Sequence, residues 1–198
     1  MKKVLSIFIL LVFLCGCRKT PKIEVEFYTQ QSIQVLGVSI SVKDMVNDIK
    51  DKKWRKFIKR LYANNYKEYN KTIDILAQLL NGEGGKTTTN QASVAWCVLN
   101  RVDKTKGRKT IIQIATAKHQ FAWNKRAPIK NHLKKLAKDV LNRWISEKTG
   151  KKNVGRVLPK GYCYFGGDGT WNRFRLYYKV GHKGQKRIIP KYSKIYKD

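Results

Sequence analysis

The stretch TIDILAQLLNGEGGKTTTNQASVAWCVLNRV (residues 72–102) decides the fold of this chain. Residues 73–80 and residues 92–102 each place apolar side chains at helical spacing, which predicts two largely buried helices. Glycines on both sides of Glu83 end the first helix, because glycine accepts the backbone conformation of a helix C-terminus. The stretch therefore reads as two packed helices joined by a short turn.

Glu83 is the only acidic residue between Asp74 and Asp103. We expect it at a rigid helix end, beside apolar neighbours and near an opening. The helix dipole and partial burial both disfavour the anion there, so the carboxyl pKa should rise and leave a protonated fraction near neutral pH. A general acid needs that state. The alternative is an ordinary exposed glutamate at a helix end.

The sequence after Glu83 predicts a mainly α (α+β) fold with a small β or irregular C-terminal part. The helix after Glu83 is expected to have Thr89 or Asn90 as its N-cap and Asn100 with Arg101 as a solvated tip. A short third helix should follow Thr110. A longer amphipathic helix should be capped by Asn131 and end at Gly150. Residues 162–165 look like a strand that enters a glycine-rich bend, and residues 180–198 form a basic tail.

Residues 18–70 are predicted to be a basic linker and helical arm that precede the main domain, residues 71–198. Residues 21–40 alternate apolar and polar side chains, which permits a short hairpin or an extended linker. Residues 41–69 carry an apolar stripe among many lysines, typical of a helix that packs on the domain or lies on a membrane surface.

The formal net charge of +30 is the outlier in the composition. Charge of this size indicates the partner more than the fold, and it suits nucleic acid, an anionic membrane or an acidic polymer such as bacterial wall. The N-terminal sequence bears on which of these the protein meets.

Residues 1–17, MKKVLSIFILLVFLCGC, have the pattern of a signal peptide for export. Their end resembles the lipobox of bacterial lipoproteins, in which Cys17 is lipidated, although Cys15 departs from the usual residue and leaves plain secretion or a retained anchor open. A lipid chain plus a polybasic body supplies the two signals that stable membrane attachment requires. We therefore expect an exported, membrane-anchored protein of the cell envelope, in the periplasm or at the cell surface, and no nucleic-acid partner.

Two aromatic segments are candidates for binding sugars. In the loop of residues 119–123, rings alternate with imidazole and amide groups, and rings can stack on the apolar faces of sugars while polar groups meet hydroxyls. The alternative is that Phe121 and Trp123 belong to the core. The strand-like segment and the bend after it would form a second wall of a cleft. The candidate substrate-binding residues are His119, Gln120, Phe121, Trp123, Tyr164, Phe165 and Trp171.

Four blocks of the chain resemble, in order and approximate spacing, the cell wall hydrolases of the spore-cortex-lytic (SleB) type: residues 81–83, 91–102, 120–123 and 164–165. The resemblance covers about residues 73–171. It implies a lysozyme-like helical domain that cleaves the β-1,4 bond between N-acetylmuramic acid and N-acetylglucosamine in peptidoglycan glycan strands. Glu83 matches the catalytic glutamate. Members of the family are associated with lytic transglycosylase chemistry, which leaves a 1,6-anhydro product.

The chain departs from this family in the loop of residues 84–89, which has no second acid. A glycosidase with two carboxylates needs the second one about 5 to 10 Å away. We therefore favour a one-acid mechanism, in which Glu83 first protonates the glycosidic oxygen and then accepts a proton from the C6 hydroxyl of the sugar. A water-hydrolysing muramidase that uses Asp168 stays open.

Other chemistries have little support in the sequence. The three histidines and four cysteines form no His-x-x-His or Cys-x-x-Cys pair, so we predict no metal site and no cofactor. Cys97 falls on a buried helical face, and Cys163 could pair with it in an oxidising compartment. The competing function is a non-catalytic, lipid-anchored cationic protein that binds wall polymers on the same scaffold.

Overall fold

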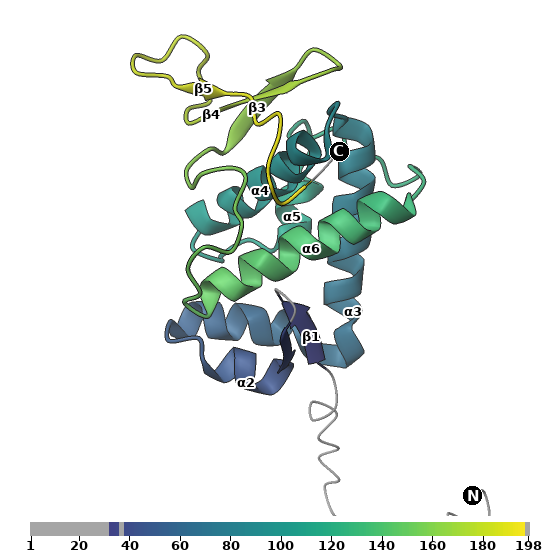
Figure 1. Ribbon diagram of the computed structural model, residues 1–198, viewed down its shortest axis with the longest axis vertical. Helices are drawn as coiled ribbons and strands as arrows, with labels where there is room; N and C mark the ends of the chain where they lie inside the picture. The colour runs from purple at the N-terminus through teal and green to yellow at the C-terminus, as the bar shows by residue number, and fades with distance from the viewer. Residues whose placement is uncertain (1–31, 36–37, 197–198) are drawn as a thin grey trace, which may run out of the picture.

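The computed structural model describes residues 32–35 and 38–196. It has a helical body with a small three-stranded sheet at one end (Figure 1), so the predicted mainly helical α+β class is confirmed. The helices are α2 (Val42–Asn47), α3 (Lys52–Glu83), α4 (Thr88–Lys104), α5 (Ile111–Ala115) and α6 (Asn131–Lys148). The strands are β1 (Ser32–Val35), β2 (Val38–Ser41), β3 (Tyr164–Gly167), β4 (Asn172–Arg175) and β5 (Arg187–Ile188).

Helix α4 lies at the centre of the body. Its residues 92–100 are all buried, and a helix that is buried on every side must be surrounded by other elements. Helices α3, α5 and α6 pack against it. Trp96 of α4 and Trp144 of α6 are among the largest side chains that are completely buried.

Helix α3 consists of two helices joined at a kink. Residues 63–66 leave helical geometry, and three of them have left-handed φ angles of 52°, 52° and 65°. Two of these three are asparagines, which tolerate that region better than most residues. The first part of α3 packs into the apolar core through Phe57, Ile58 and Leu61, so of the two alternatives for residues 41–69 the helix that packs on the domain is the one observed. The helix also continues without a break through residue 70, where the sequence placed a boundary.

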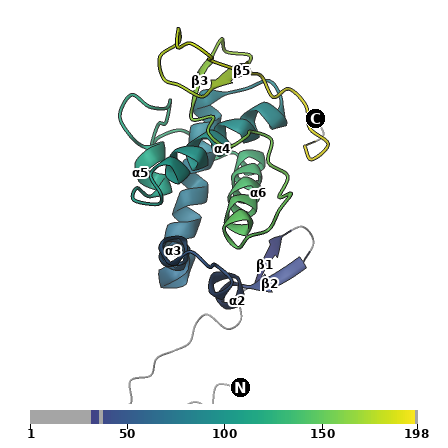
Figure 2. The same ribbon diagram turned by 90° about the vertical axis from the view of Figure 1, so that its left-hand side faces the viewer.

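Strands β1 and β2 form an antiparallel hairpin in which Ser32 pairs with Ser41. Of the two alternatives for residues 21–40, the hairpin is therefore the one observed in the described part, whereas residues 21–31 lie outside the described residues. It lies with α2 at the opposite end of the body from β3–β5 (Figure 2). The predicted signal peptide and Cys17 lie outside the described residues. Among the described residues, no helix combines the length and apolar character that crossing a membrane requires.

Two predicted helix caps are wrong and two boundaries are confirmed. Thr87, not Thr89 or Asn90, caps α4: its hydroxyl accepts from the Asn90 amide at 3.2 Å. Asn131 is the first residue inside α6, and Lys130 stands at the cap position without a side-chain hydrogen bond. Thr110 does cap α5, in a reciprocal capping box with Gln113. Gly150, with φ of 90°, follows the end of α6.

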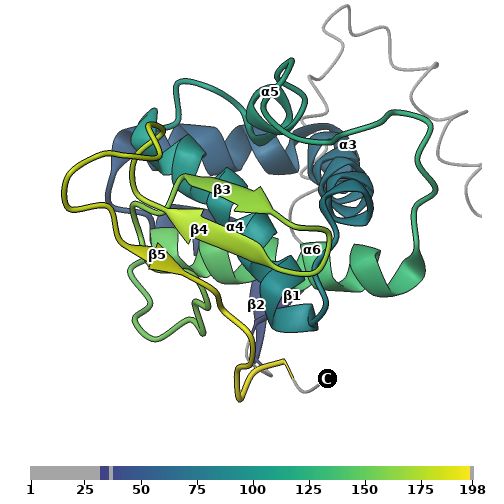
Figure 3. The same ribbon diagram turned by 90° about the horizontal axis from the view of Figure 1, so that it is seen from above.

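The C-terminal sheet has the order β3-β4-β5, so β3 is an edge strand. Seen from above, β3 and β4 cross over α4 (Figure 3). The strand predicted at residues 162–165 is observed two residues later, at Tyr164–Gly167. The reason is that the carbonyls of Tyr162 and Cys163 accept hydrogen bonds from side chains of α4, at 2.9 and 2.5 Å, instead of from a neighbouring strand.

Candidate active site

A cavity of about 410 Å³ opens beside the C-terminal end of α3. It is formed by the end of α3, one side chain of α4, the loop before α6 and the edge strand β3. Five residues predicted for the site line it: Glu83, His119, Gln120, Phe121 and Phe165. The structure therefore brings together the candidate acid and four of the seven candidate binding residues.

Glu83 is the last residue of α3 and is half-buried. The helix ends at Gly84, whose φ is 65° and whose amide donates to the Leu80 carbonyl at 3.2 Å. The backbone amide of Ala122 donates to Glu83 Oε1 at 2.5 Å. In the part of the chain that the structure describes, Glu83 makes no ion pair and Ala122 is the only donor to its carboxyl group. Oε2 is thus left for a ligand in the cavity.

The pKa of the Glu83 carboxyl is raised above its ordinary value. Burial is the largest cause, because it penalises the charged form. The hydrogen bond from the Ala122 amide and the charge of Arg101 act in the opposite direction without cancelling it. A larger share of this carboxyl group is therefore protonated near neutral pH than in an exposed glutamate.

Glu147 shows the opposite outcome in a second, larger cavity of about 730 Å³ at the end of α6. Burial would raise its pKa, but hydrogen bonds from Lys160 and Arg156 outweigh burial and lower it. Their distances to the carboxylate are 2.8 and 2.9 Å. Glu147 is thus held as an anion in an ion-pair network and is unsuited to donate a proton.

Gly82 permits the loop of residues 119–123 to dock on α3. A Cβ atom at this position would lie 2.2 Å from the carbonyl oxygen of Ala122, so any side chain would displace the loop. The same loop residue donates its amide to Glu83. The glycine before the acid therefore sets the distance between the carboxyl group and its hydrogen-bond donor.

Gln78 holds the continuation of the same loop. Its Nε2 donates to the carbonyls of Lys125 at 3.0 Å and Ala127 at 3.1 Å. Its Oε1 accepts from Trp123 Nε1 at 3.3 Å. Trp123 thus fastens the loop to α3 and does not line the cavity, contrary to its predicted binding role.

Arg101 enters the cavity from α4, and the sequence did not predict this. Its Nε donates to the Cys163 carbonyl at 2.5 Å and its Nη1 to Gln120 Oε1 at 2.9 Å. Its guanidinium carbon lies 4.3 Å from the centre of the Phe121 ring, a cation–π distance. Arg101 therefore holds both the loop and the segment before β3.

The expectation of a solvated tip at Asn100 and Arg101 is wrong. Asn100 is only 2 % exposed, and its Nδ2 donates to the carbonyls of Pro159 at 3.0 Å and Tyr162 at 2.9 Å. The segment before β3 folds over this end of α4 and supplies these acceptors. The segment is far away in the sequence, so the pattern of the helix alone contained no signal for it.

The aromatic wall of the cavity rests on the sheet. The rings of Phe121 and Phe165 are 6.0 Å apart, and Phe165 packs on Phe174 of β4 at 5.2 Å. Tyr164 lies next to the cavity with its ring 5.2 Å from the Arg101 guanidinium carbon. Trp171 stands instead beside Lys191, at 5.3 Å. The sequence predicted that Tyr164 and Trp171 bind the substrate, but neither residue lines the cavity.

Asp168 does not line the cavity either. Its carboxylate forms an ion pair with Arg173 at 2.8 Å and accepts from the amides of Thr170 and Trp171 at 3.0 and 2.8 Å. The amides are the main cause that lowers the pKa of Asp168. The structure thus gives this residue a role in the β3–β4 turn.

Two buried asparagines fasten the sheet to the turn that carries Glu83. Asn90 Oδ1 accepts from the Asn172 amide at 3.0 Å, and its Nδ2 donates to the carbonyls of Asn172 and Pro190, each at 3.2 Å. Asn172 Nδ2 in turn donates to the Glu83 carbonyl at 3.4 Å. The sequence indicated Asn90 only as a possible N-cap of α4, because its partners Asn172 and Pro190 are far away in the chain.

Both cysteines in the body are buried free thiols. Burial raises the pKa of Cys97 to about 12 and also raises the pKa of Cys163. Thiols in this state are poor nucleophiles and poor metal ligands. Within the described ranges, no three His, Cys, Asp or Glu residues are grouped so that they could hold a metal ion.

The fold and the cavity together define a mainly helical α+β protein with a half-buried glutamate at a helix end. Comparisons with protein-family models, curated proteins and solved structures found no match to this chain. The resemblance to the spore-cortex-lytic hydrolases therefore stays a prediction.

Proposed function

We propose that this protein cleaves peptidoglycan at the β-1,4 bond between N-acetylmuramic acid and N-acetylglucosamine, with Glu83 as general acid and base. One observation carries the proposal: a carboxyl group with a raised pKa lies in a cavity beside aromatic rings, and one of its oxygens receives no hydrogen bond from the described residues. This is the arrangement that protonation of a glycosidic oxygen requires.

The remaining lining residues suit a sugar polymer. Phe121 and Phe165 present rings that can stack on the apolar faces of pyranoses, and Gln120 offers an amide for hydroxyl or acetamido groups. Gly166 and Gly167 of the edge strand leave space beside them, because they have no side chains. A glycan strand would thus lie between the loop and β3, with its scissile bond at Glu83.

The proposed mechanism uses a single carboxyl group. Glu83 donates its proton to the glycosidic oxygen as the bond to C1 breaks, and the resulting carboxylate accepts the proton of the C6 hydroxyl as that oxygen attacks C1. The Ala122 amide supports the anion between the two steps. This route needs no second acid, in keeping with the position of Asp168 in an ion pair outside the cavity lining.

The proposed location is the cell envelope, with the chain exported and held at a membrane by a lipid on Cys17. The peptidoglycan strand is the proposed partner, and no nucleic acid is involved. Alkaline hydrolysis and mass spectrometry of the mature N-terminus would detect the lipid.

Replacing Glu83 by glutamine tests the activity. Gln keeps the size of the side chain and can still accept from Ala122, so the Glu83→Gln protein should fold and lose release of soluble fragments from purified wall. The matched control is Asp168→Asn, which should keep most of its activity in the one-acid mechanism. Anhydro-muropeptides among the products identify transglycosylation, and their absence identifies hydrolysis. A folded and fully active Glu83→Gln protein would exclude the assignment.

The second candidate is a non-catalytic cationic protein that binds wall polymers, and the net charge of +30 favours it. It predicts binding that weakens steeply with salt and no fragment release at any salt concentration. A zymogram of wild-type protein at low and moderate ionic strength separates the two candidates.

A further inference from the structure

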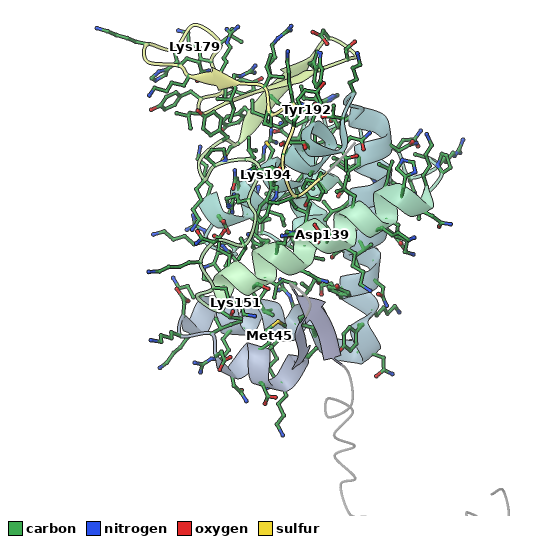
Figure 4. The ribbon with its side chains drawn as sticks, viewed as in Figure 1. Met45, Asp139, Lys151, Lys179, Tyr192 and Lys194 are labelled. Carbon is green, nitrogen blue, oxygen red and sulfur yellow. The ribbon has the colours of Figure 1, made fainter. Side chains whose placement is uncertain are left out.

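The connection between β4 and β5 projects from the top of the body beyond the helices (Figure 1). We call this connection, together with the first residue of β5, the arm (residues 176–187). Its large side chains Tyr177, Tyr178 and Val180 are 43 %, 74 % and 53 % exposed. Lys179 lies at its outer end (Figure 4). Side chains of this size are seldom left in water without a partner when they are grouped together.

The arm is an ordered loop that its own hydrogen bonds hold. Gln185 is at its centre: Nε2 donates to the carbonyls of Tyr177 at 3.0 Å and Lys179 at 3.2 Å, and Oε1 accepts from the Tyr177 amide at 3.1 Å. The rings of Tyr177 and His182 stack at 3.9 Å. Because the loop is already ordered, little conformational entropy is lost when it binds a partner.

Aromatic rings connect the arm to the cavity. Tyr178 contacts Tyr164 edge to face with 5.7 Å between ring centres. The guanidinium of Arg101 lies between the rings of Tyr164 and Phe121, at 5.2 and 4.3 Å. A path of rings and one cation thus leads from the cavity lining to the exposed tyrosines of the arm.

The charge of the arm has one sign. Residues 169–196 contain eight basic residues and no acidic residue. Four of the cations belong to the arm: Lys179, Lys183, Lys186 and Arg187. All four are exposed, and none forms an ion pair with another part of the described chain.

We propose that the arm extends the catalytic cavity and binds the next part of the same strand, a glycan that carries acidic peptides. The tyrosine rings stack on sugars and the four cations meet the carboxylates of the peptides. This inference rests on the proposed function for the identity of the polymer. It adds a preference for glycan that still carries its peptide stems over neutral glycan, because only the former offers carboxylates to the arm.

Binding is measured without cleavage in the Glu83→Gln background. The arm variant replaces Lys179, Lys183, Lys186 and Arg187 by glutamine. The control variant makes the same change at four exposed lysines at the start of α3, near the other end of the body: Lys52, Lys53, Lys56 and Lys59. Both variants lose four charges, so any difference between them comes from position. Thermal melting verifies that both are folded.

The main probe is purified wall from which phosphodiester-linked polymers have been removed. At low salt the arm variant should bind it about 16-fold more weakly, since four exposed ion pairs contribute roughly twofold each. The control variant keeps the four cations of the arm, so its binding should weaken about twofold or less. Chitin, a neutral β-1,4 glycan, should bind weakly and equally to both variants.

Tyr178 supplies an independent readout. Tyr178→Ala should weaken binding to both purified wall and chitin, because a ring that stacks on sugar serves either glycan, and Tyr178→Phe should restore it. Equal losses in the arm and control variants would overturn the proposal, since net charge alone would explain them. A loss seen only on wall that retains its phosphate polymers, or only on anionic vesicles, would assign the arm to another ligand and overturn it too.

Fragment release by wild-type protein keeps the two proposals apart. If wild-type protein releases no fragments while the arm variant alone loses binding, the proposed cleavage is wrong and the arm still binds wall. If wild-type protein cleaves wall and the arm variant binds like the control, only the inference about the arm is wrong.

Discussion

The substitution Gly82→Ala tests how the loop holds the Glu83 carboxyl group, which we propose to be catalytic. Gly82 lies in the last turn of α3, where alanine is a better helix former by about 1 kcal/mol. The new Cβ atom would, however, lie 2.2 Å from the Ala122 carbonyl oxygen, whereas ordinary contacts begin at 3.4 Å. The loop must therefore move away from α3 by roughly 1 Å, because a packed backbone cannot overlap.

This movement breaks one hydrogen bond. The bond from the Ala122 amide to Glu83 Oε1 is 2.5 Å long and would exceed hydrogen-bond distance after such a shift. A hydrogen bond to a charged group contributes about 1.5–3 kcal/mol to stability. We use the lower value of about 1.5 kcal/mol, because this hydrogen bond is partly exposed. The gain in helix propensity offsets most of it, so the free energy of unfolding should fall by about 0.5 kcal/mol and the melting temperature by only about 1–2 °C.

Activity should fall much more than stability. A misplacement of about 1 Å at a reacting group costs on the order of 100-fold in rate. In the wild-type protein the hydrogen bond from Ala122 lowers the pKa of Glu83, so its loss should raise this pKa further in the variant. Because the protonated form is the acid, the rate falls as pH rises through this pKa, and the alkaline limb of the pH profile should move to higher pH.

The assay is the clearing of a purified wall suspension as a function of pH, with thermal melting of the same samples. Gly181→Ala is the control for melting, because a Cβ atom there meets nothing within 4 Å. Wild-type rates and an unchanged alkaline limb in Gly82→Ala would refute the view that this loop positions Glu83.

Three further predictions concern the residues around the cavity. Arg101→Lys keeps the charge but cannot reproduce both hydrogen bonds of the guanidinium, so kcat should fall about tenfold, and an unchanged kcat would contradict this. Arg101→Gln should in addition move the alkaline limb of the pH profile to higher pH, because Arg101 lowers the Glu83 pKa. Asn90→Ala removes two buried hydrogen bonds and one partly buried hydrogen bond, and it should lower the free energy of unfolding by about 2–4 kcal/mol in urea titrations. A change below about 0.5 kcal/mol would mean that the sheet is held by other contacts. Cys97 and Cys163 should resist alkylation at pH 8 in the folded protein and react after unfolding, as peptide mass spectrometry can show, whereas a disulfide between them would contradict the structure.

The sequence predicted the features that depend on neighbours along the chain. The helices on both sides of Glu83, the short helix after Thr110 and the end of α6 before Gly150 all follow from side chains within one or two turns of each other. The errors came where a local pattern had two solutions. Thr87, Thr89 and Asn90 can each cap a helix, and tertiary contacts decided among them, because the side chain of Asn90 is used 82 residues away at Asn172.

The sequence by itself determined that a solitary glutamate ends a buried helix and is followed by glycines, since helix periodicity and glycine backbone freedom are local properties. Only the tertiary structure decided that the carboxyl group is half-buried and faces a cavity, because its surroundings come from residues 119–122 and 165–167, far away in the chain. Arg101 and Gln78 joined the site for the same reason: their hydrogen-bond partners are supplied by distant segments. Burial, which raises the Glu83 pKa, is thus a property of the assembled fold and not of the stretch that contains the acid.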